Sequence, residues 1–143
     1  WEGRRYLGDQ SWSSDEFVRI AHAQRRLEAD LARKASRGVV VADTDALVTA
    51  VWHERYVGSA NPKLDALAKG WVPDLYLVCR PDFGWVQDGT RESESLRDEM
   101  QASMEQRAHA SGVEVVVLSG PHEQRLAKAL AAIDAVTEFE ELI

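Results

Sequence analysis

The sequence has little of what marks secreted, membrane-spanning or zinc-binding proteins. Its single cysteine, Cys79, cannot build a disulfide framework or a thiolate zinc site. No apolar run approaches the roughly 20 residues of a membrane span, and no basic stretch followed by an apolar one resembles a signal peptide. The formal net charge of −7 argues against a nucleic-acid-binding surface. We therefore expect a cytoplasmic protein that contacts neither a membrane nor a nucleic acid.

The 143 residues suffice for one domain with a substantial core. Helical periodicity alternates with short β-branched runs, which predicts an α/β fold, a three-layer sandwich around a parallel sheet. Ser13 and Glu16 have capping-box spacing, Asp45 is placed to cap a second helix, and the acidic residues 138–143 are expected to fray. The expected strands cover residues 39–42, 75–79 and 113–118, and the expected helices cover residues 17–35, 47–52, 63–69, 96–108 and 126–133.

Ligands of parallel α/β sheets bind beyond the carboxyl ends of the strands. The loops at those ends are residues 43–45, 80–97 and 119–125. In the first loop, Asp43 and Asp45 flank Thr44 directly after an apolar run. Carboxylates in that position hold Mg²⁺ or accept a proton from a substrate hydroxyl. A helix cap beside a solvated acid is the alternative, although a cap accounts for only one of the two acids.

The other two loops carry arginines. Residues 82–97 form a long loop with Trp85 and Arg91, which is typical of a lid whose arginine meets phosphoryl oxygens. A solvated surface loop is the alternative. Gly120 and Arg125 lie on either side of the expected start of the last helix. A glycine there lets a nucleotide approach closely, and an arginine can face adenine or phosphate. A plain helix cap is the alternative there.

Two further patterns carry no chemistry. Gly3 and Gly8 have the spacing of P-loop glycines, but Asp9 stands where the lysine belongs, and an acid there repels phosphate. The histidines lack metal-ligand spacing and are expected in the core or on the surface. They are His22, His53, His109 and His122.

Taken in order, these residues resemble the NadR-type ribosylnicotinamide kinases, which are P-loop NTPases. The resemblance spans roughly residues 12–136. Its first run is Ala42-Asp43-Thr44-Asp45, Thr49, Tyr56-Val57-Gly58 and Pro62, and its second is Trp85-Val86-Gln87-Asp88-Gly89-Thr90-Arg91. His22-Ala23-Gln24 is similar to an H-A-Q sequence in the family's first helix, and Gly120 with Arg125 to a late G … R.

The resemblance implies ATP-dependent phosphorylation of the 5′-hydroxyl of ribosylnicotinamide, which yields nicotinamide mononucleotide for NAD biosynthesis. The implied cofactors are ATP and Mg²⁺. Three residues are implied to be catalytic: Asp43 at the Mg²⁺ or base position, Asp45 on the ribose side and Arg91 in the lid. Those implied to bind substrate or nucleotide are Thr44, His22, Gln24, Trp85, Asp88 and, on the adenine side, Arg125.

The family's first strand and its Walker A loop have no counterpart in the 143 residues. The resemblance therefore implies one P-loop kinase-like domain over residues 1–143, incomplete at its amino end and inactive by itself. Two alternatives stay open: another P-loop nucleoside or nucleotide kinase, and a non-catalytic α/β module that binds a nucleotide. The expected partner is a small-molecule nucleoside, and the sequence leaves homo-oligomer formation open.

Overall fold

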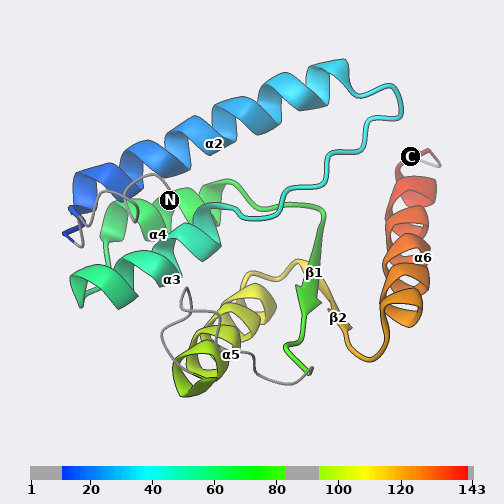
Figure 1. Ribbon diagram of the computed structural model, residues 1–143. Coiled ribbons are helices and arrows are strands. Elements are labelled where there is room, and N and C mark those ends of the chain that lie inside the picture. Colours follow the sequence, from blue (N-terminus) through cyan, green and yellow to red (C-terminus); the bar gives the residue numbers. More distant parts are fainter. Residues whose placement is uncertain (1–10, 83–93, 142–143) are drawn as a thin grey trace. The chain divides into compact units, whose positions relative to one another are not determined.

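The computed structural model describes residues 11–82 and 94–141 and divides the chain into two compact units, Trp1–Trp71 and Val72–Ile143 (Figure 1). None of the helices in the described part of the chain is long and apolar enough to cross a bilayer. The first unit contains α2 (Ser14–Lys34), α3 (Ala46–Val57) and α4 (Pro62–Gly70), and the second contains β1 (Leu75–Cys79), α5 (Glu94–Ala110), β2 (Glu114–Leu118) and α6 (His122–Glu141).

The first unit is a bundle of three helices around one large aromatic residue. Phe17 of α2 and Leu64 of α4 are fully buried, and small residues surround them at Ala21, Ala46 and Ala50. Because alanine side chains are small, the helices can approach closely. The Phe17 ring fills the space that remains between them. Burying a phenylalanine of this kind contributes roughly 1.5–3 kcal/mol to folding.

Local hydrogen bonds set the limits of these helices, and the predicted capping box of Ser13 and Glu16 is confirmed. The backbone N–H and the hydroxyl of Ser13 both donate to the carboxylate of Glu16 at 2.9 Å. At the end of α3, Gly58 adopts a left-handed φ of 85° and donates its N–H to the carbonyl of Glu54 at 2.9 Å. The Oδ1 atom of Asn61 then accepts from Lys63 N–H at 2.9 Å and starts α4.

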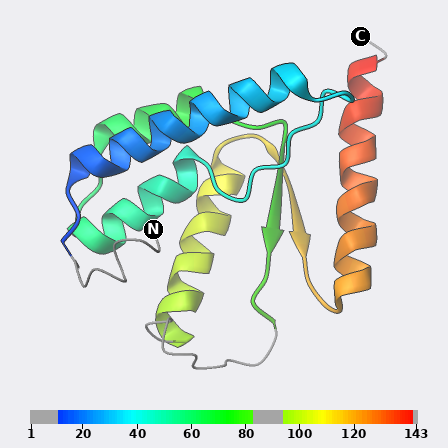
Figure 2. The same ribbon diagram turned by 45° about the horizontal axis from the view of Figure 1, so that its top comes forward.

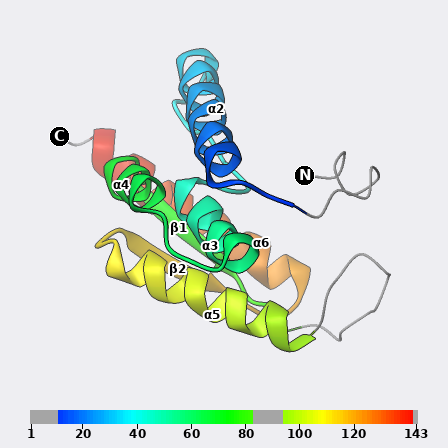
Figure 3. The same ribbon diagram turned by 90° about the vertical axis from the view of Figure 1, so that its left-hand side faces the viewer.

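The second unit is built on two parallel strands. Residue Leu75 of β1 pairs with Glu114 of β2, and Cys79 pairs with Leu118. The helix α5 connects the strands, so the unit is a β–α–β crossover followed by α6. The two helices lie on opposite sides of the strand pair (Figure 2), and Figure 3 shows α5 running along β2. This mixed α/β arrangement with a small parallel sheet is consistent with a P-loop-like domain.

The strand prediction for residues 39–42 is wrong. That segment is irregular, with Val41 74% exposed and Val39 38% exposed. A strand is stable only when a neighbour satisfies its backbone groups, and the sheet of the described residues consists of β1 and β2 alone. The expected fraying of residues 138–143 is also wrong in part, because α6 continues to Glu141.

Candidate functional site

The acidic loop before α3 divides its two carboxylates between two environments. The Asp45 Oδ1 atom accepts the backbone N–H of Val48 at 3.0 Å, so Asp45 caps α3 as predicted. Asp43 lies two residues earlier in the irregular segment, and it is exposed. The cap thus accounts for Asp45, while Asp43 is exposed and presents a carboxylate that a ligand can reach.

Helix α2 brings two predicted substrate-binding residues toward this loop. The Thr44 hydroxyl donates to Oε1 of Gln24 at 3.3 Å. Gln24 and Asp45 line one narrow crevice with Trp71. The crevice measures about 10 Å³, which is room for no more than about one water molecule. His22 is exposed, and its ring meets the Trp71 ring edge-on at 5.3 Å between centroids.

Several residues that carry the resemblance have structural explanations in this unit. Thr49 is buried, and its hydroxyl donates to the carbonyl of Asp45 at 2.9 Å, which reinforces the first turn of α3. The Tyr56 ring stacks on Trp52 at 5.6 Å, and Gly58 closes the helix. Pro62 occupies the first position of α4, where its missing N–H costs nothing. The first run of the resemblance therefore corresponds to α3, the turn after it and the start of α4, with the two acids just before α3.

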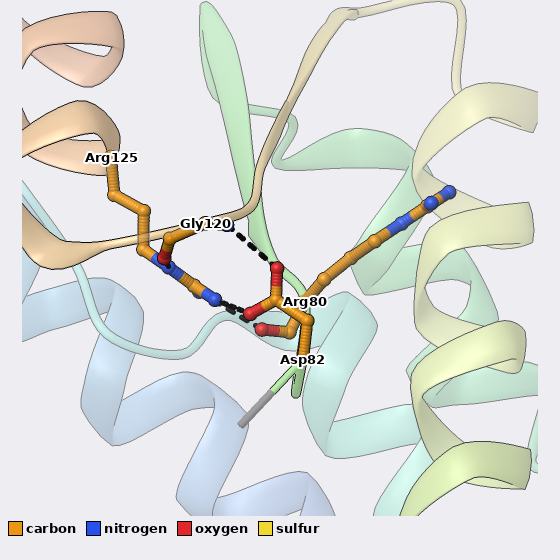
Figure 4. A network of polar contacts seen from close by, with 4 residues as sticks. All are labelled: Arg80, Asp82, Gly120 and Arg125. Atoms are coloured by element: carbon orange, nitrogen blue, oxygen red, sulfur yellow. Dashed lines mark hydrogen bonds and ion pairs between the residues drawn. The ribbon is translucent and has the colours of Figure 1, made fainter. Parts of the chain in front are cut away.

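In the second unit, the loops after β1 and β2 are joined by one polar network (Figure 4). Asp82 accepts the backbone N–H of Gly120 through Oδ2 at 2.7 Å, and its Oδ1 forms an ion pair with the guanidinium of Arg125. Arg125 also donates to two carbonyls, from Nε to Gly120 at 2.6 Å and from Nη1 to Arg80 at 2.9 Å. Arg125 thus connects α6 to both strand ends.

The Arg80 side chain takes a different direction from its carbonyl. It extends away from Asp82 in Figure 4 and donates to Glu105 of α5 at 2.9 Å. This hydrogen bond, together with the charge of Glu105, raises the pKa of Arg80 above its ordinary value. The guanidinium of Arg80 is therefore committed to α5, and only its backbone carbonyl belongs to the network.

The network borders an open hollow of about 600 Å³. That volume falls within the usual range of small-molecule sites, although an open hollow covers a ligand on one side only. Its lining residues are Asp82, Gly120, Pro121, His122 and Arg125. Within the two described segments, no group of three or more acidic, histidine or cysteine side chains could hold a metal ion.

The structure thus places the predicted residues in two separate groups. Asp43, Thr44, Asp45, His22 and Gln24 belong to the first unit, and Arg125 belongs to the second. The lid residues Trp85, Asp88 and Arg91 lie outside the described residues. Sequence reasoning missed Asp82 as a site residue, although its place three residues after a strand was a usable signal.

Comparison with protein families identifies the domain type. The family model described as "AAA domain" matches residues 2–125. A search of the solved structures found no match. Because the family match covers far more than half of the chain, the protein belongs to the AAA domain family and is a P-loop NTPase-like domain.

Proposed function

We propose that the full-length protein is an ATP-dependent ribosylnicotinamide kinase with a three-layer P-loop fold. The observation that carries the proposal is the ordered series that runs from Asp43-Thr44-Asp45 to the W-V-Q-D-G-T-R sequence ending at Arg91, within a chain that belongs to the AAA domain family. An AAA domain supports nucleotide binding, and the resemblance of the series to ribosylnicotinamide kinases supports ribosylnicotinamide as the acceptor. The product is nicotinamide mononucleotide, so the reaction belongs to NAD biosynthesis.

Phosphoryl transfer assigns distinct roles to the residues of the acidic loop. The 5′-oxygen of the nucleoside forms a bond to the γ-phosphorus of ATP, the bond to the β,γ-bridging oxygen breaks, and ADP leaves. Asp43, which is exposed, accepts the proton of the 5′-hydroxyl. Asp45 and Thr44 face the ribose, with Gln24 held beside Thr44 at 3.3 Å. The remaining predicted contacts come from His22, Trp85, Asp88, Arg91 and Arg125.

The donor set of this loop fits Mg²⁺. Magnesium keeps most of its water shell and is held by one or two carboxylates together with substrate phosphates. An exposed Asp43 offers such a carboxylate, and a cage of three or more ligands is not required. When bound, the ion neutralises charge that develops on the transferring phosphoryl group. Asp43 is the residue that would hold it, by way of the water shell of the ion, so that its carboxylate could still accept the proton.

The test is a phosphotransfer assay with the full-length gene product. ATP and ribosylnicotinamide should give ADP and nicotinamide mononucleotide in equal amounts, faster than any nucleoside of a panel. Asp43→Asn should lower kcat by about 10²–10⁴, the usual contribution of a general base. Asp134→Asn, the same exchange at an exposed position of α6, is the matched control.

Two results would replace the proposal. Faster phosphorylation of another nucleoside would identify a P-loop kinase with a different acceptor. Tight Mg·ATP binding without transfer to any acceptor would identify a non-catalytic nucleotide-binding module.

A further inference from the structure

We propose that Asp82 is a positioning residue, which fixes Arg125 and the turn at Gly120 as the wall of a site for the base of the nucleotide. The inference rests on the proposed function, because the resemblance places the nucleotide base on the side of Arg125. It adds a residue and a role that neither the sequence nor the family match assigns. Asp82 acts through the other two residues and need not touch the nucleotide.

The two oxygens of Asp82 have separate tasks. One accepts the backbone N–H of Gly120 at 2.7 Å, and the other forms the ion pair with Arg125. Asp82 is separated from Gly120 by 38 residues, so the contact joins two loops that follow different strands. A carboxylate shared between a backbone amide and a guanidinium is a charge-assisted arrangement, stronger than a typical neutral hydrogen bond.

Arg125 is engaged at all three of its guanidinium nitrogens. Nε and Nη1 donate to the carbonyls of Gly120 and Arg80, and Nη2 meets Asp82. The side chain is only 17% exposed, whereas a typical surface ion pair is open to solvent and contributes little. Because Asp82 balances the charge of Arg125, the hollow beside them favours a neutral group over a phosphate. A purine base is such a group.

Both polar groups of the Gly120 backbone are hydrogen-bonded. Its N–H is used by Asp82 and its carbonyl by Arg125. Its φ of 83° is the left-handed conformation that other residues rarely adopt. Next to it, Pro121 and His122 line the hollow, and the planar imidazole ring of His122 is a suitable surface for an aromatic base to pack against. The position of this wall therefore depends on Asp82.

The test measures Mg·ATP binding by calorimetry with the full-length protein, together with steady-state kinetics. Asp82→Asn and Arg125→Lys should each raise the Kd for ATP by about tenfold, as expected for loss of a charge-assisted hydrogen bond. The KM for ATP should rise in parallel in both variants, and in Asp82→Asn kcat and the KM for the nucleoside should stay unchanged. The double variant should lose little more than either single variant.

Lys128→Gln is the matched control. Lys128 is also a cation of α6, and it donates to the carbonyl of Val117 in β2 at 2.8 Å without touching Asp82 or Gly120. Its removal should leave the Kd for ATP unchanged.

An unchanged Kd for ATP in Asp82→Asn would overturn the inference. So would an equal loss of affinity for ATP and for the nucleoside, because that is the result of a merely structural defect. Absence of ATP binding by the unmodified protein would overturn it as well. Nucleotide binding that responds to Asp82 while ribosylnicotinamide stays unphosphorylated would reject the proposed function and leave this inference standing.

Discussion

The buried ring of His53 joins Ser14 and Ser59 across three segments of the first unit. Its Nδ1 lies 2.9 Å from the carbonyl oxygen of Ser59, and its Nε2 lies 2.8 Å from the Ser14 hydroxyl. A carbonyl can only accept, so Nδ1 carries a hydrogen and donates it to Ser59, and Nε2 pairs with the Ser14 hydroxyl. The ring also meets Phe17 edge-on at 5.3 Å. His53 is therefore a satisfied core residue, as the lack of ligand spacing predicts.

Replacing His53 by alanine should lower the free energy of unfolding by at least about 2 kcal/mol, since the change leaves a cavity and two unsatisfied groups. Ser14→Ala removes only one partner and should cost about 1 kcal/mol. Urea unfolding followed by tryptophan fluorescence measures both. His109→Ala, at an exposed position of α5, is the control and should change little. Equal midpoints for His53→Ala and the unmodified protein would contradict the packing described here.

Two glycines of the first unit should respond oppositely to alanine. Gly58 ends α3 with a φ of 85°, and an alanine there should cost about 1–2 kcal/mol even though no atom lies within 4 Å of the added methyl. Gly70 is the last residue of α4 and has no positive φ, so the same exchange should be neutral or stabilising by up to about 1 kcal/mol. Thermal unfolding of the two variants gives the comparison. A similar loss at both positions would show that backbone strain does not explain the effect.

Elements with strong local signals could be predicted from the sequence. The capping residues of α2 and α3 lie within four residues of the groups that they bind, so their spacing is visible in the chain. Strands were also predicted at residues 75–79 and 113–118, and the observed strands β1 and β2 (Glu114–Leu118) pair with each other. Residues 39–42 have the same β-branched composition but no hydrogen-bonded neighbour in the sheet of the described residues. Composition indicates which segments can be strands, while pairing decides which are.

The candidate site, too, could be predicted from the sequence only in part. Asp43 and Asp45 stand out because they follow an apolar run, and Arg125 stands out through the resemblance. The contact between Asp82 and Gly120 joins residues 38 positions apart, and no periodicity or spacing rule reports such a contact. The role of Arg125 as a connection between two strand ends could not be predicted for the same reason.

The irregular segment before α3 can be tested at Val41. At 74% exposure, Val41→Lys should change the free energy of unfolding by less than about 0.5 kcal/mol. Leu118 of β2 is only 4% exposed and provides the comparison. Leu118→Ala should lower the free energy of unfolding by about 2–5 kcal/mol. Urea titrations of both variants decide the point. Severe destabilisation by the lysine would mean that residues 39–42 are buried after all.

Asp45 caps α3, and it is also proposed to contact the ribose. Two substitutions separate these roles. Asp45→Ala should cost about 1 kcal/mol, because Val48 loses its acceptor, whereas Asp45→Asn keeps an oxygen there and should stay within a few tenths. If the charge of Asp45 serves the substrate, the asparagine variant should still lose at least about tenfold in kcat/KM, since its amide oxygen lacks the full negative charge.

The matched control for Asp45 is Asn61, the cap of α4, whose Oδ1 accepts from Lys63 and Leu64. Asn61→Ala should reproduce the stability loss of Asp45→Ala with kcat/KM unchanged. The measurements are urea unfolding and steady-state kinetics of the full-length protein. An Asp45→Asn enzyme of full activity would reduce Asp45 to a helix cap. Asp43 would then be the only acid of this loop with a chemical role, because the cap accounts for Asp45 alone.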